Sequence, residues 1–121
     1  PVQEIELSKK DTCQLFSLDP INAFLNHDEV DVKTILTSFV TSTATNLVLL
    51  QSYVNENDFE KIKAISHKMI PMFKQIESDE IAALLTNLET NDYSQAEVKS
   101  IYEKLQPQIS KVIALIEKYI N

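Results

Sequence analysis

The sequence has 121 residues and not one of them is glycine. Hairpin turns and phosphate-cradling loops rely heavily on glycine, because it adopts their backbone conformations without steric cost. The absence therefore argues against a β architecture and against a nucleotide-binding loop. A helical protein that uses Asn, Asp and Ser at its corners needs glycine least, and we expect that class of fold.

Cysteine and basic residues are also scarce. The single cysteine, Cys13, cannot form an internal disulfide, which fits a reducing compartment. Lys and Arg number 11 against 18 Asp and Glu, so the net charge is −7. Nucleic acids and anionic membranes bind basic faces, so we predict direct contact with neither. No apolar run reaches membrane-spanning length, and we expect a cytoplasmic location.

The pattern that is present is that of amphipathic helices. Apolar residues recur at spacings of three and four along stripes that begin at Ile35, Phe59, Ile81 and Val98. A short helix over residues 19–26 precedes them. The connections are short, so successive helices should run antiparallel. We therefore predict an all-α fold, an antiparallel up-and-down four-helix bundle with a short extra N-terminal helix.

The first part of the chain differs from the rest. Residues 1–18 carry no lasting helical stripe, and we interpret them as a linker or N-terminal arm ahead of a bundle over residues 19–121. Because the chain starts at Pro1 rather than Met, we expect a piece of a longer polypeptide. The arm is expected to pack partly on the bundle through Leu15, Phe16 and Leu18.

Several residues are typical of helix starts. Asp28 is expected to cap the long helix. Two pairs have the spacing of a capping box, in which each side chain bonds the other residue's backbone N–H. These pairs are Asn57 with Glu60 and Ser94 with Glu97.

Residues 61–75, KIKAISHKMIPMFKQ, place a histidine and a proline four residues apart inside one stripe. On a helical wheel of about 100° per residue with Phe59 at zero, the apolar residues span about 220° to zero. His67 falls at about 80°, so we expect its side chain to face solvent. Pro71 cannot donate a hydrogen bond to the carbonyl of His67, which leaves that carbonyl free.

Cations and small side chains surround this position. Lys63 and Lys74 lie within about 40° of His67 on the wheel, and Lys68 flanks it further round. Such ammonium groups would attract and steady an anionic group such as a phosphoryl. We expect a small apolar docking patch beside the histidine, formed by Ala64, Ile70 and Pro71.

Less specific interpretations stand beside this one. A single exposed histidine is more often a solvated surface residue, and His27, in the loop LNHDE, is interpreted in that way. Two histidines and one cysteine without repeating spacing make a zinc site improbable, and we predict no metal site. Cys13 lies in the arm, and no acid near His67 in the sequence is placed to orient it.

Three stretches carry a family resemblance. They are FSLDPINAFLNHDEVDVKTILTSF, NENDFEKIKAISHKM, which holds His67, and IAALLTNLE. Together they resemble the histidine phosphotransfer (HPt) domains of multistep two-component phosphorelays, over nearly all of residues 19–121. The resemblance is strongest to the modules at the C-terminal end of hybrid sensor kinases.

The sequence departs from the common family pattern, H-x-L-K-G. Ile70 and Pro71 stand where that pattern has lysine and glycine, so only His67 carries over directly. The phosphoryl-stabilising role of the family lysine would fall to Lys63, Lys68 or Lys74.

The resemblance implies a phosphocarrier. His67 would accept a phosphoryl group from the aspartate of a response-regulator receiver domain and pass it to another receiver. The domain would have no kinase activity of its own and no cofactor, with Mg²⁺ on the receiver. It would be monomeric as an isolated domain, in the cytoplasm or within a membrane-anchored sensor kinase. The alternatives are a phosphotransfer-inactive helical module that docks receivers, and a plain helical adaptor.

Overall fold

The computed structural model describes residues 16–26 and 28–121, and this part of the chain is all-helical, as predicted. It contains no strand, and none of its helices has the length and apolar content needed to cross a membrane. The helices are α2 (Asp19–Phe24), α3 (Glu29–Glu56), α4 (Phe59–Gln75), α5 (Asp79–Thr90) and α6 (Gln95–Ile120).

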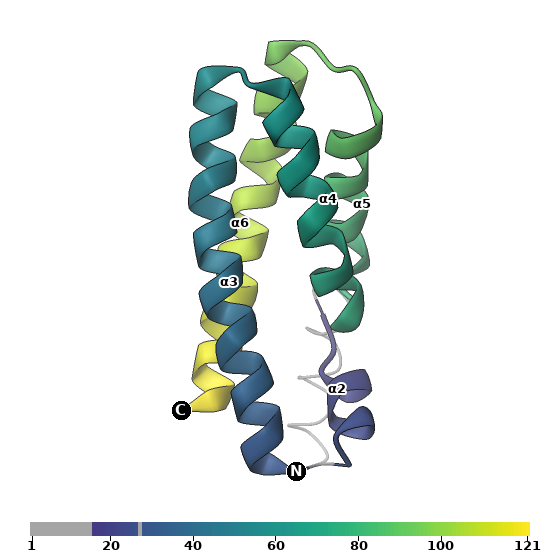
Figure 1. Cartoon of the computed structure of the whole chain (residues 1–121), viewed down its shortest axis with the longest axis vertical. Coiled ribbons are helices and arrows are strands. Elements are labelled where there is room, and N and C mark those ends of the chain that lie inside the picture. Colours follow the sequence, from purple (N-terminus) through teal and green to yellow (C-terminus); the bar gives the residue numbers. More distant parts are fainter. Residues whose placement is uncertain (1–15, 27) are drawn as a thin grey trace.

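The four longer helices pack side by side (Figure 1). α3 lies along α6, and α4 makes its most extensive contacts with α5. α3 also packs against α4, and α5 also packs against α6. The short α2 lies toward the end of the molecule that holds the start of α3 and the C-terminus. Each long helix is therefore held by two others, which fixes the face that it presents to solvent.

One apolar core runs between the helices. Phe73 of α4 is fully buried and meets Phe39 of α3 edge-to-face, with ring centroids 5.5 Å apart and planes at 77°. An aromatic pair of this geometry stabilises by about 0.5–1.5 kcal/mol beyond its burial. It fixes α4 against α3 less than two turns from His67. The other fully buried apolar side chains come from α3 to α6 and the segment after α4: Leu36, Leu50, Ile62, Met69, Ile76, Ile81, Leu85, Leu105, Ile109, Val112 and Ile116.

Two apolar residues of α4 differ from their predicted exposure. Ile62, Met69 and Phe73 are buried as expected, but Phe59 at the start of the helix is 39% exposed. Ile70, expected on the outer face, is only 9% exposed. The physical reason is α5, which packs along one flank of α4 and covers a strip that the wheel alone assigned to solvent.

The helix starts follow the sequence signals with one correction. Asp28 accepts a hydrogen bond from the N–H of Asp31 at 3.0 Å, and Ser94 and Glu97 form the full capping box. The predicted box at Asn57 is wrong. Asp58 caps α4 instead, accepting from the Lys61 N–H at 3.2 Å. Asn57 has φ of 57° and ends α3 in the left-handed conformation.

The last residues of the predicted arm pack on the helices. Phe16 is buried and Leu18 is partly buried against the core. The Ser17 N–H donates a hydrogen bond to the carbonyl of Ile76, just after α4. Leu15 lies outside the described residues. The boundary between arm and bundle at residues 18 and 19 is thus not marked by a loss of contacts.

Without glycine, other residues occupy left-handed backbone positions. Among the described residues these are Asn26, Asn57 and Glu77, with φ between 53° and 57°. At Glu77 the N–H bonds the Lys74 carbonyl at 3.1 Å, and the next N–H, of Ser78, bonds the Phe73 carbonyl at 2.9 Å. This is the hydrogen-bond pattern that ends many helices with a glycine. Asn tolerates the conformation well, whereas Glu gains no local compensation for it.

Replacing Glu77 by glycine is expected to stabilise the protein. The left-handed conformation costs a residue with a Cβ about 1–2 kcal/mol, so Glu77→Gly should raise the free energy of unfolding by about 1 kcal/mol. Asn57→Gly is the matched control, with an expected change of less than about 0.5 kcal/mol. Urea unfolding measures both. A Glu77→Gly variant no more stable than wild type would show that this position carries no strain.

Candidate functional site

His67 lies on the solvent side of α4, as the wheel predicted. Its side chain is 74% exposed. It stands one residue after Ser66, which is completely buried. The ring is therefore anchored by a buried backbone segment while its nitrogens remain accessible to a visiting molecule.

One ring nitrogen of His67 has a partner that sequence reasoning missed. The Nδ1 atom contacts Oε2 of Glu89, in the last turn of α5. A carboxylate can only accept a hydrogen bond, so in the neutral ring the proton lies on Nδ1 and Nε2 carries the lone pair. No group in residues 16–26 or 28–121 bonds Nε2. The two residues are 22 positions apart, so no local motif in the sequence could have revealed the contact.

The end of α5 that carries Glu89 is held by its own side chains. The Thr90 hydroxyl donates to the Thr86 carbonyl at 2.8 Å. The amide of Asn91 donates to the Asn87 carbonyl at 3.2 Å. Both bonds run from a side chain back to a carbonyl four residues earlier, so they add to the backbone bonds of this last turn. Glu89 is 27% exposed and so approaches His67 from a fixed element.

A second polar contact joins the same two elements. Lys63, one turn before His67 on α4, places Nζ 2.5 Å from Oδ1 of Asp92, which follows α5. The hydrogen bond from Lys63, with the positive charge of the ammonium group, lowers the pKa of Asp92 below its ordinary value of 3.8. Desolvation opposes this only weakly, because the Asp92 side chain is 94% exposed. Lys63 therefore already has a carboxylate partner, unlike the free cation that the wheel suggested.

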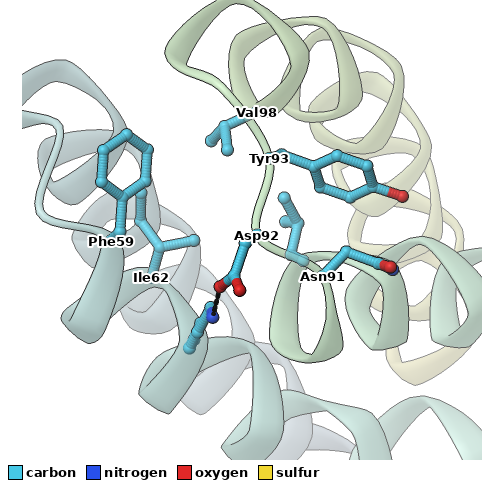
Figure 2. Close-up of a pocket in the computed structure, with 8 residues that line it drawn as sticks. Phe59, Ile62, Asn91, Asp92, Tyr93 and Val98 are labelled. Carbon is cyan, nitrogen blue, oxygen red and sulfur yellow. Dashed lines mark hydrogen bonds and ion pairs between the residues drawn. The ribbon is translucent and has the colours of Figure 1, made fainter.

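A small cavity of about 170 Å³ adjoins this ion pair (Figure 2). It lies between the start of α4, the segment after α5 and the start of α6. Lys63 lines this cavity but His67 does not, so the histidine stands on an open surface beside it. The cavity is lined by Phe59, Ile62, Lys63, Leu88, Asn91, Asp92, Tyr93 and Val98.

The predicted docking patch is smaller than expected. Ala64 and Pro71 are exposed, in agreement with the wheel. Ile70 is buried and contributes to the core instead, because α5 covers that side of α4. The exposed surface beside His67 thus combines one small and one compact side chain, which leaves room around the ring.

The three predicted phosphoryl-stabilising lysines differ in their surroundings. Lys68 and Lys74 are exposed, and within the described part of the chain neither forms an ion pair. Only Lys63 is paired. A helical side chain leans toward the N-terminus of its helix. Lys74 therefore leans toward His67, whereas Lys63 leans away from it, toward Asp92.

Metal ligands do not gather in this part of the molecule. Over residues 16–26 and 28–121, no three or more His, Cys, Asp or Glu side chains group in a way that could hold a metal ion. His27 and Cys13 lie outside the described residues. The titratable groups at and near His67 are an imidazole, carboxylates and ammonium groups.

Comparison with known proteins yields no relative: no family model, no curated protein and no solved structure matches the chain. The arrangement around His67 is therefore the basis for assigning a function.

The titration of Asp92 tests the ion pair directly. Its carboxyl resonance, followed by NMR, should titrate below 3.8, and Lys63→Gln should return the midpoint toward that value. Because the folded pKa is the lower one, the pair contributes stability above the ordinary pKa. That contribution is lost as the pH falls through the lowered value. Lys61→Gln, two residues earlier and on another face of α4, is the control and should leave the Asp92 midpoint unchanged. An Asp92 midpoint that stays the same in the Lys63→Gln variant would contradict the ion pair.

Proposed function

We propose that this chain is a phosphorelay carrier of the histidine phosphotransfer type. His67 accepts a phosphoryl group from the aspartyl phosphate of one receiver domain and passes it to another. The observation that carries the proposal is the exposed His67 ring, whose Nδ1 contacts Glu89 and whose Nε2 has no hydrogen-bond partner among the described residues. The sequence resemblance over residues 19–121 supports the same assignment.

The fold that goes with this proposal is an antiparallel up-and-down four-helix bundle of α3 to α6, with α2 as the short extra helix. The pairwise packing of α3 with α6 and of α4 with α5 is compatible with it. In the cell, the domain would act in the cytoplasm as the C-terminal module of a hybrid sensor kinase. It would itself be monomeric and without kinase activity.

The transfer is a displacement at phosphorus. The lone pair of His67 Nε2 forms the N–P bond while the bond from phosphorus to the aspartyl oxygen breaks, and that oxygen leaves with the electron pair as a carboxylate. Such a loose, in-line transition state needs positioning and charge neutralisation more than covalent help. Mg²⁺ on the receiver neutralises the phosphoryl oxygens there. The chain itself supplies the nucleophile and nearby ammonium groups.

Glu89 makes the transfer reversible. By accepting the hydrogen bond from Nδ1–H, it holds the proton on that nitrogen before and after Nε2 is phosphorylated. When the next receiver attacks the phosphorus atom, the ring leaves as neutral imidazole with its proton still on Nδ1. If that proton were lost, the leaving group would be an imidazolate anion, which is far more basic and leaves slowly. Glu89 is thus a positioning residue for the nucleophile.

The runner-up is an interaction module of the same shape that docks receivers without transferring phosphate. The feature that favours it is the pair Ile70 and Pro71, which stand where the common family pattern has lysine and glycine. Ile70 is an apolar residue and is buried, so the position where the family pattern has lysine offers no cation to a phosphoryl group. Labelling of His67 distinguishes the two functions.

Phosphate transfer to His67 is the primary test. A panel of purified receiver domains, charged with acetyl phosphate and Mg²⁺, is mixed with the chain. We expect acid-labile, base-stable phosphate on wild type and none on His67→Gln. His27→Gln removes the other histidine and should leave labelling unchanged. Receivers that bind the chain but never label it would support the docking module instead.

The role of Glu89 has its own test in the initial rate of transfer. Glu89→Ala removes the acceptor for Nδ1–H and should slow transfer by about tenfold or more, as loss of an orienting carboxylate does elsewhere. Glu89→Gln still accepts through its amide oxygen and should recover most of the rate. Glu80→Ala, exposed in the first turn of α5, is the control. Equal transfer rates for Glu89→Ala and wild type would show that Glu89 has no role in the transfer.

A further inference from the structure

Two carboxylates from one end of α5 engage the two basic groups on the same face of α4. Glu89 contacts Nδ1 of His67, and Asp92, three residues later, bonds Nζ of Lys63 at 2.5 Å. Lys63 precedes His67 by four residues, which is about one helical turn. The cation nearest in sequence to His67 on its own face is thus neutralised while the histidine is unphosphorylated.

Phosphorylation would change this charge balance. A phosphoryl group brings about −1.5 to −2 charge. It would arrive on the ring that Glu89 contacts, about one helical turn along α4 from Lys63, whose charge is matched by Asp92. The phosphorylated state therefore gains a strong new competitor for the Lys63 ammonium group.

The ion pair of Lys63 with Asp92 is exposed and weak enough for Lys63 to change partner. The Asp92 side chain is 94% exposed and that of Lys63 is 38% exposed. Exposed ion pairs are weak, because water solvates both partners and long side chains lose entropy when they are held. Lysine has a flexible four-carbon stem and a compact charge, so it can swing between partners one turn apart. Asp92 would lose little on release, since water already reaches it.

We propose that Asp92 is a positioning residue that competes with the phosphoryl group on His67 for Lys63. When Nε2 is phosphorylated, Lys63 leaves Asp92 and bonds the phosphoryl oxygens, and Asp92 becomes solvated. Asp92 thereby limits how tightly the site holds the phosphoryl group and shortens its lifetime. This inference rests on the proposed function of His67 and adds the residue that sets the stability of its phosphorylated form.

The lifetime of phosphohistidine tests the competition without any receiver. The purified chain is charged with phosphoramidate, which phosphorylates imidazole directly, and decay of the acid-labile phosphate on His67 is followed at neutral pH. Asp92→Asn frees Lys63 and should lengthen the half-life by about two- to fivefold, the range of an exposed ion pair. Asp92→Glu should restore the wild-type half-life. Glu103→Gln, exposed on α6, controls for the change in net charge.

The double variant decides whether Asp92 acts through Lys63. In a Lys63→Gln background, Asp92→Asn should change the half-life hardly at all, while a Lys61→Gln background should preserve the full effect. The difference should also shrink at about 1 M salt, where the Debye length is about 3 Å, which a purely structural role would not explain. An equal effect with and without Lys63, no effect of Asp92→Asn, or no labelling of His67 would each overturn the proposal.

The two proposals can fail separately. If receivers label His67 but Asp92→Asn leaves the half-life unchanged, the competition is wrong and the carrier function stands. If phosphoramidate reveals the Lys63-dependent effect but receivers never transfer phosphate, the competition is supported and the relay function fails.

Discussion

The packing of α5 along α4 is the constraint on which the rest of the site depends. Ser66 and Ile70 are buried in α4, whereas the His67 side chain beside them stays exposed to solvent. The same packing brings Glu89 and Asp92 to the exposed face. A shift of α5 by one turn, about 5.4 Å, would separate both carboxylates from their partners at once. The orientation of the ring and the partner of Lys63 are therefore consequences of helix packing.

The connection between these two helices carries its own cost. Glu77 adopts the left-handed conformation there. Ser78 occupies the N-cap position of α5, but its buried hydroxyl makes no capping bond and has no hydrogen-bond partner among the described residues. An unpaired buried hydroxyl costs about 1–3 kcal/mol on the evidence of protein mutations. The Oγ of Ser66, next to His67, is in the same state. The packing of the apolar core, including the buried Phe39–Phe73 pair, has to offset these local costs.

The sequence predicted what a repeat of 3.6 residues can determine. The helical class, most of the buried stripes and the outward direction of His67 follow from local spacing. The wheel failed at Ile70, because the spacing of one helix does not reveal which flank its neighbour covers. The contact of Glu89 could not be predicted from the sequence for a related reason. Its contact with His67 spans 22 residues and exists only through the packing of α5. Asn57 was misjudged because the same residue type suits a helix start and a left-handed helix end.

A carrier has to accept a phosphoryl group and also give it away, so a site that bound the group too tightly would fail. Under the proposed function, fixed negative charge from Glu89 and Asp92 would raise the free energy of the phosphorylated state, and mobile positive charge from Lys63 and Lys74 would lower it. Glu89 couples its charge to a geometric task, since it also fixes the proton on Nδ1. Within residues 16–26 and 28–121, Asp92 forms no hydrogen bond with the ring, and the side chain that it pairs with is Lys63. Under the proposed function, a substitution at Asp92 would therefore change the lifetime of the phosphorylated state without disturbing the nucleophile.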